Sequence, residues 1–124
     1  MKIKYNNDYR EISQGLLKSF EKVSIGMAKV ATSDWKQNHL NLYINDSKGN
    51  GNIIELQMYG LGKVNRTEEV SVDWLLAEGV QKPFFRELYN VLIGLNELEI
   101  EPDSIHIKFE CGKIVSIEVF AYFN

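Results

Sequence analysis

The strongest constraint on the fold is a helical pattern that runs directly into two alternating patterns in the last third of the chain. Between residues 80 and 98, apolar side chains recur at the spacing of one helix face, whereas residues 104–111 and 113–123 alternate apolar and polar side chains as strands do. The pattern predicts a long helix followed by a β-hairpin. The side chains expected on the buried face of that hairpin are Ile105, Ile107, Phe109, Val115, Ile117, Val119 and Ala121.

Weaker patterns upstream predict a first helix and three strands. Residues 8–20 carry apolar side chains at helical spacing, with Asn7 or Asp8 as the N-cap. From residue 22 to about 32 the period changes to two, because Val23, Ile25 and Met27 alternate with small residues, which predicts a strand. Residues 40–45 and 54–59 alternate in the same way, and the three strands would form an antiparallel meander.

The segment of residues 60–79 lacks a clear pattern, and a loop of that length without structure would be unusual in a compact domain. We expect an element within it. Asp73 suits the cap of a short helix over residues 74–78, and Gly79 suits its end in the left-handed conformation.

These elements predict one α+β domain over residues 1–124. An antiparallel sheet of about five strands would pack in two layers against an N-terminal helix and the long helix. The order along the chain would be α-β-β-β-short α-α-β-β. No stretch approaches the roughly 18 apolar residues of a membrane span, and the lone Cys111 suits a reducing compartment. We therefore expect a cytoplasmic protein that does not bind a membrane.

Motifs that carry chemistry are scarce in this chain. A zinc site needs several ligands at a useful spacing, and His39, His106 and Cys111 do not provide one. The odd spacing of five places His106 and Cys111 on opposite faces of a strand, which argues against a nucleophile with its base. The glycines of residues 49–51 and 60–62 match no nucleotide-binding fingerprint. We expect no enzyme, no metal and no cofactor.

Charge is distributed unevenly along the chain. Residues 1–67 hold ten Lys or Arg and six Asp or Glu, whereas residues 68–124 hold four and eleven. An acidic half argues against nucleic acid as a ligand and favours a basic protein partner, unless strands of the two halves interleave and mix the charges. The densest acidic cluster, which could equally be a solvated turn, consists of Glu97, Glu99, Glu101 and Asp103.

Aromatic residues occupy the positions that should face away from the helices. If Leu42, Met58 and Val119 face the core, the alternate positions point outward, where polar residues are expected in a sheet covered on one side. Those outward residues are Tyr43, Tyr59, Phe120 and Tyr122. Such a face would be an interaction surface, unless residues 60–79 fold across it.

The closing segment resembles a known family. Residues 102–109, PDSIHIKF, and 112–122, GKIVSIEVFAY, look like the end of YezG-like immunity proteins of bacterial polymorphic toxin and contact-dependent growth inhibition systems. Those proteins also begin with a helix that leads into a strand of the WEKV type, which residues 20–23, FEKV, partly match. The likeness covers about half of the chain. It implies a cytoplasmic antidote that binds a cognate toxin domain, often a nuclease, and carries no catalytic residues.

An antidote of this kind would block a basic nuclease with carboxylates and aromatic anchors. The residues expected to bind the partner are Glu68, Glu69, Asp73, Trp74, Glu97, Glu99, Glu101, Asp103, Tyr59 and Tyr122. One alternative is a small-molecule-binding or enzymatic domain, with a pocket lined by Phe84, Phe85, Tyr89 and Phe109. Another is a structural subunit that dimerises through its aromatic face. The sequence leaves the oligomeric state open.

Overall fold

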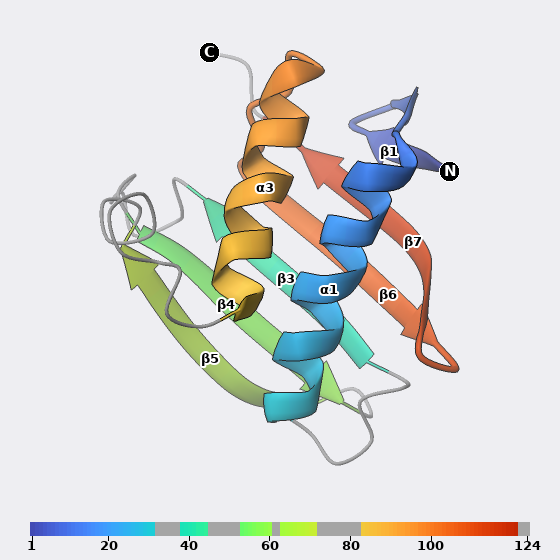
Figure 1. The fold of residues 1–124 in the computed structure, drawn as a ribbon. Helices are drawn as coiled ribbons and strands as arrows, with labels where there is room; N and C mark the ends of the chain where they lie inside the picture. The colour runs from blue at the N-terminus through green and yellow to red at the C-terminus, as the bar shows by residue number, and fades with distance from the viewer. Residues whose placement is uncertain (32–37, 45–52, 61–62, 72–82, 122–124) are drawn as a thin grey trace.

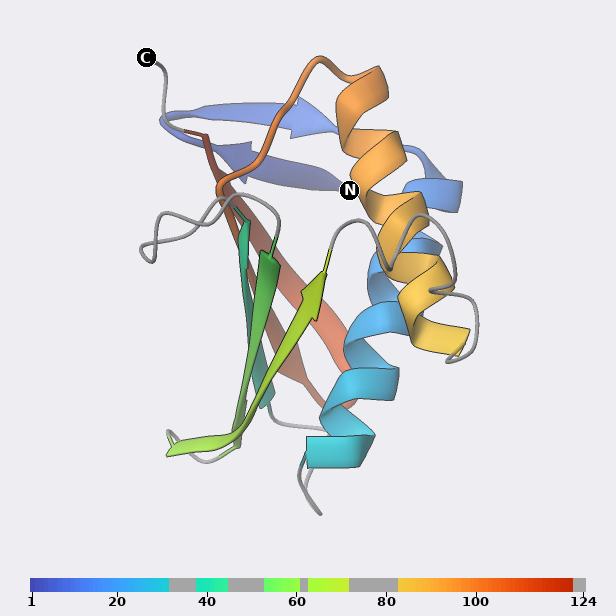
Figure 2. The same ribbon diagram turned by 90° about the vertical axis from the view of Figure 1, so that its left-hand side faces the viewer.

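The computed structural model describes residues 1–31, 38–44, 53–60, 63–71 and 83–121. Within these ranges the seven strands form one mixed sheet in the order β2-β1-β7-β6-β3-β4-β5. The two helices that are described lie side by side on one face of this sheet (Figure 1, Figure 2). The elements are β1 (Lys2–Tyr5), β2 (Asp8–Glu11), α1 (Gln14–Ala31), β3 (Asn38–Ile44), β4 (Ile53–Gly60), β5 (Lys63–Ser71), α3 (Pro83–Glu97), β6 (Ser104–Glu110) and β7 (Lys113–Phe120).

The chain begins with a β-hairpin, and the predicted helix over residues 8–20 is wrong over residues 8–13. β1 pairs antiparallel with β2 and parallel with β7. Asn6 turns the hairpin with φ at 52°. Helix α1 begins at Gln14, directly after Ser13. Ser13 is its N-cap, because the Ser13 hydroxyl accepts a hydrogen bond from the backbone N–H of Leu16 at 3.1 Å. The apolar spacing that suggested one helix is therefore divided between a strand and a helix.

Residues 22–31 continue α1, so the strand predicted over residues 22–32 is wrong. Phe20, Val23 and Met27 are buried and extend the helical stripe of Leu16 at spacings of four, three and four. Small residues between them also fit a period of two, and this is the reason for the error. Ser24 is fully buried, and its hydroxyl has no hydrogen-bond partner among the residues described.

An edge strand, β5, lies within the segment where the sequence predicted only a short helix. It pairs antiparallel along β4, but its sequence, KVNRTEEVS, places only Val70 among the core residues. The pattern that marks a strand is therefore missing. The short helix over residues 74–78 lies outside the described residues. The predicted antiparallel sheet of about five strands on an N-terminal helix is wrong, because the described sheet has seven strands and includes a parallel pair.

α3 and the hairpin of β6 and β7 occupy the predicted positions. α3 begins at Pro83, which suits a first helical turn because proline lacks the N–H that would be unpaired there. One detail of the hairpin differs from the prediction. The register shifts opposite Lys108 and Phe109, so Val115 turns outward and is 47% exposed, while Ile114 packs against the core in its place.

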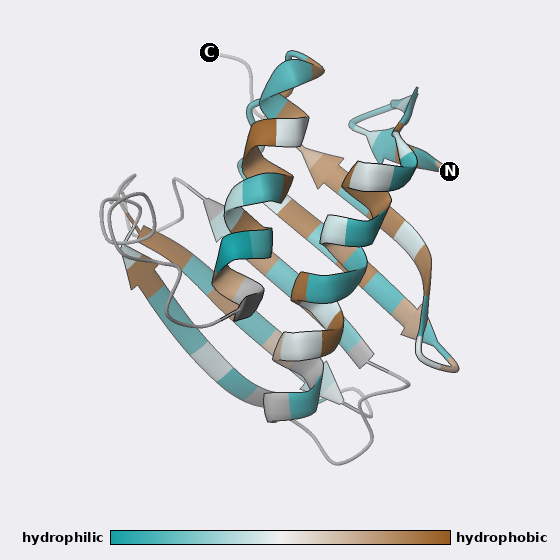
Figure 3. Ribbon diagram, viewed as in Figure 1, coloured by the Kyte–Doolittle hydropathy of each residue, from teal (hydrophilic) through white to brown (hydrophobic). Residues whose placement is uncertain are grey.

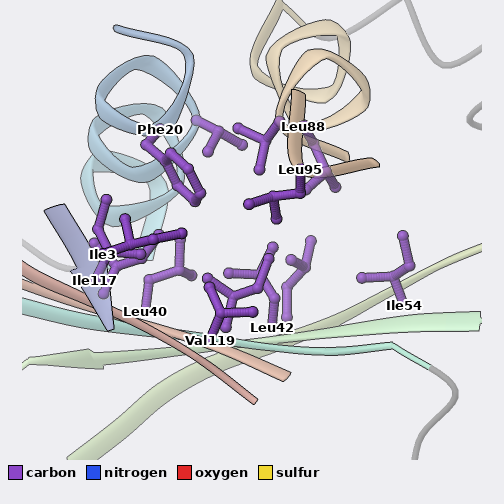
Figure 4. Packing of buried hydrophobic residues seen from close by; sticks show 14 of the residues in the cluster. Ile3, Phe20, Leu40, Leu42, Ile54, Leu88, Leu95, Ile117 and Val119 are labelled. Atoms are coloured by element: carbon purple, nitrogen blue, oxygen red, sulfur yellow. The ribbon is translucent and has the colours of Figure 1, made fainter. Parts of the chain in front are cut away.

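One hydrophobic core fills the space between the helices and the sheet (Figure 4). Phe20, Leu88 and Leu95 meet strand residues such as Leu42 and Ile117 there. Along the strands, hydrophobic and hydrophilic residues alternate (Figure 3), so one face supplies the core and the other does not. No helix in the described ranges combines the length and apolarity that crossing a bilayer requires.

Candidate functional site

The sheet face that the described helices leave uncovered carries aromatic and polar side chains together. Strand pairing arranges them in three rows that cross the strands, and we call this surface the outer face. The first row is Glu69, Glu55, Tyr43, Ser104 and Phe120. The second row is Thr67, Gln57, Asn41, His106, Glu118, Lys4 and Tyr9. The third row is Val64, Tyr59, His39, Lys108 and Ser116.

Three aromatic side chains form a strip where the first two rows meet. The ring of His106 lies between the rings of Tyr43 and Phe120, with centroid distances of 5.9 and 5.4 Å. Both contacts are edge-to-face, a geometry that contributes about 0.5–1.5 kcal/mol per pair beyond burial. All three side chains are half-buried. We call Tyr43, His106 and Phe120 the aromatic strip.

The protonation of His106 is set by two opposing effects. Burial lowers the pKa of the imidazole below its ordinary value of 6.5, and the carboxylate of Glu118 acts in the opposite direction. Burial is the larger of the two effects. The neutral imidazole therefore predominates at pH 7, and the aromatic strip carries little positive charge.

Side-chain hydrogen bonds along β4 fix the polar groups beside the strip. The hydroxyl of Tyr59 donates to Oε1 of Gln57 at 2.6 Å, and Nε2 of Gln57 donates to Oε1 of Glu55 at 2.6 Å. The three residues are two apart and so share one face of the strand. The carboxylate of Glu55 is thus held by Gln57, and Glu55 lies opposite Tyr43 in the first row.

Some of the predicted partner-binding residues meet at this face. Glu69 and Tyr59 belong to the first and third rows. Asp103 adjoins the first row, because its backbone N–H donates to the carbonyl oxygen of Phe120 at 2.8 Å. Glu99 and Glu101 are exposed in the connection from α3 to β6 that ends at Asp103.

The connection after α3 has a defined backbone conformation. The N–H of Ile100 donates to the carbonyl oxygen of Leu95, and that of Glu99 to Asn96. This pair of bonds is the Schellman motif, in which the left-handed position is usually glycine. Here Glu99 occupies it with φ at 61°, and Ile100 is buried behind it.

Other predicted residues lie apart from the outer face. Glu68 points to the helix side of β5, where its carboxylate pairs with the guanidinium of Arg66. Glu97 is exposed in the last turn of α3. The remaining three, Asp73, Trp74 and Tyr122, lie outside the described residues. The expected set therefore does not form a single surface.

The predicted partner-binding set omits most residues of the outer face, among them Glu55, His106 and Glu118. Alternation along each strand indicates that they point outward. The order of strands, which places Glu55 beside Tyr43 and Glu118 beside His106, cannot be deduced from alternation.

Of the four residues expected to line the alternative pocket, three have described side chains. Phe85 and Phe109 are core residues with 3% and 2% exposure, whereas Tyr89 is 37% exposed on α3. The side chain of Phe84 lies outside the described part of the chain.

Comparison of the chain with protein-family models, with curated proteins and with solved structures finds no match.

Proposed function

We propose that this protein is an immunity protein, a cytoplasmic antidote that binds a cognate bacterial toxin domain and neutralises it. The outer face is the observation that supports this function most directly. Half-buried aromatic rings occupy a sheet surface where water-facing polar residues would be expected. Aromatic side chains surrounded by polar groups are typical of surfaces that bind proteins.

The proposed mechanism is steric and electrostatic blockade of the toxin's active site. A nuclease is the expected class of toxin, because a cleft that binds phosphates is lined with Lys and Arg. Carboxylates on the antidote would speed association and fix the orientation, while buried aromatic anchors would supply most of the affinity. The resemblance of the closing segment to YezG-like immunity proteins supports the same function.

Co-expression with the toxin encoded beside this gene tests the proposal. We expect the chain to restore growth to cells that make the active toxin. We also expect it to copurify in a fixed ratio with a catalytically inactive form of the toxin. Cells that stay arrested, together with an inactive toxin that elutes separately, would show that the function is wrong.

A further inference from the structure

We infer that the toxin docks on the first two rows of the outer face and presents arginine side chains to them. This inference rests on the proposed function and identifies both the surface and the chemistry of its partner. Three features support it: the aromatic strip lies at the centre of the sheet, carboxylates surround the strip, and a side-chain hydrogen bond fixes the carboxylate of Glu55.

The aromatic strip lies at the centre of the sheet. Its residues come from β3, β6 and β7, and β6 is the middle strand of the seven described. Residues that dominate binding energy cluster near the centre of an interface, where a partner excludes water from them, and aromatic residues are enriched among them. The half-buried strip fits that description, because a partner would cover the rings that remain partly exposed.

The charges beside the strip select a basic partner. The five members of the first row include two carboxylates, Glu55 and Glu69, and no cation. Asp103 borders the opposite end of the row next to Phe120. In the second row Glu118 adjoins His106, and Lys4 follows it farther out. Negative charge therefore lies close to the strip.

A guanidinium group fits this arrangement better than an ammonium group. It is planar, so it stacks on an aromatic ring while its N–H groups donate to a neighbouring carboxylate. Tyr43 and Glu55 are direct neighbours across β3 and β4 and offer such a pair. The bond from Gln57 holds the carboxylate of Glu55 in position before the partner arrives. We therefore assign arginine to the partner in preference to lysine.

NMR titration of the ¹⁵N-labelled protein with nona-arginine and with nona-lysine, as probes of the partner, tests the surface. We expect nona-arginine to shift the amide signals of the first two rows and to bind more tightly than nona-lysine. Shifts confined to the helices, or to the third row, would overturn the inference. Equal affinity for the two peptides would overturn the assignment of arginine. Outer-face signals that change on dilution without peptide would identify a second copy as the occupant instead.

A pair of charge reversals sharpens the test. Glu69→Lys reverses one charge in the first row. Glu97→Lys makes the same change in net charge at the exposed end of α3, away from the outer face. We expect Glu69→Lys to weaken nona-arginine binding about tenfold at low salt and Glu97→Lys to weaken it much less. Both side chains are exposed, and circular dichroism checks that both variants are folded. Equal weakening by the two variants would overturn the inference.

The same two variants separate this inference from the proposed function. If the inactive toxin copurifies with Glu69→Lys as well as with the native chain, the docking surface is wrong and the antidote function stands. If the toxin does not copurify with the native chain, the antidote function is wrong whatever the peptide does.

Discussion

Three non-glycine residues in the described chain have a left-handed backbone, and each lies where an element ends. Asn6 links β1 to β2, Glu99 follows α3, and Cys111 begins the turn between β6 and β7. Asparagine tolerates this conformation, whereas glutamate and cysteine hold it at a cost of about 1 kcal/mol each. Glu99 is the most informative, because helix ends of its kind normally carry glycine.

We expect Glu99→Gly to raise the free energy of unfolding by about 1 kcal/mol, because glycine has no Cβ to clash in the left-handed region. Urea unfolding measures the change. Glu101→Gly is the matched control, since it removes the same charge from an exposed residue outside the three left-handed positions. That control should lower stability by enlarging the entropy of the unfolded chain. Equal losses at the two positions would contradict the strain at Glu99.

Among the residues that the structure describes, His106 has a pKa shifted from its ordinary value. We expect NMR to find the pKa of its imidazole below 6.5, and Glu118→Gln to lower that pKa further by removing the carboxylate that favours the proton. Lys108 on the same strand and Lys4 beyond Glu118 are the nearby cations of the face. Glu110→Gln is the control, because Glu110 lies four residues away and pairs with Lys108. An unchanged His106 pKa in Glu118→Gln would contradict the electrostatic contact.

The depressed pKa of His106 also has a consequence for stability. As pH falls below 6.5, the unfolded chain takes up the proton before the folded chain does, so the free energy of unfolding decreases. His106→Asn should remove this contribution, whereas His39→Asn, a change at the only other histidine, should leave it in place. Urea unfolding at pH 8 and pH 5.5 distinguishes the two variants.

At the scale of elements, the sequence was informative where a pattern was long and unambiguous. α3 and the β6–β7 hairpin could be predicted because their periods, 3.6 and 2, hold over many residues. The sequence of residues 22–31 fits both the helical and the strand period. The structure shows that it is helical, because Val23 and Met27 are buried on the same helix face as Phe20. β1 and β2 have four residues each, too few to define a period.

The candidate site could be predicted only in part. Alternation placed Tyr43, Tyr59 and Phe120 on the outer face, but it carries no information on which strands are neighbours. The rows exist because β3 lies between β4 and β6, strands that are far apart along the chain. Contacts such as that of Tyr43 with His106 follow from this order alone.

The contact between the two helices depends on a glycine. A Cβ built at Gly94 would lie 2.6 Å from Cδ1 of Leu16, whereas one at Gly15 would meet only Oγ of Ser13 at 3.9 Å. We expect Gly15→Ala to stabilise the protein by about 0.5–1 kcal/mol through helix propensity. Gly94→Ala should lose that gain, because the methyl group displaces Leu16.

A double-mutant cycle checks this explanation. Leu16→Ala removes the side-chain atoms that a Cβ at residue 94 would meet. Gly94→Ala should therefore change the free energy of unfolding more favourably in the Leu16→Ala background than in the native one. Additive effects on the free energy of unfolding would show that the helices do not meet at this point.

At the scale of the whole molecule, Asn6 joins segments from opposite ends of the described chain. Its side-chain Nδ2 donates to the carbonyl oxygen of Ala121 at 2.9 Å, and its Oδ1 accepts from the N–H of the same residue at 3.1 Å. The backbone N–H of Asn6 donates to the carbonyl oxygen of Val119. One side chain thus extends the pairing of β1 with β7 beyond the end of the strand.

We expect Asn6→Gly to lower the free energy of unfolding by about 1–3 kcal/mol, because glycine keeps the left-handed turn but loses both side-chain bonds. Asn7→Gly in the same turn is the control and should cost less. Hydrogen exchange should quicken at the amide of Ala121 in Asn6→Gly only. Equal losses of unfolding free energy in the two variants would show that the hydrogen bonds between Asn6 and Ala121 contribute little.

The parallel pairing of β1 with β7 has a consequence for synthesis on the ribosome. Ile3 and Tyr5 are buried in the finished fold, but the strand that completes their surroundings comprises residues 113–120. Contacts between such distant segments form slowly, and hydrophobic residues left uncovered meanwhile attract chaperones and other nascent chains. β1 is therefore among the last strands of the described sheet to pair, and the hairpin of β1 and β2 needs protection until β7 has been made.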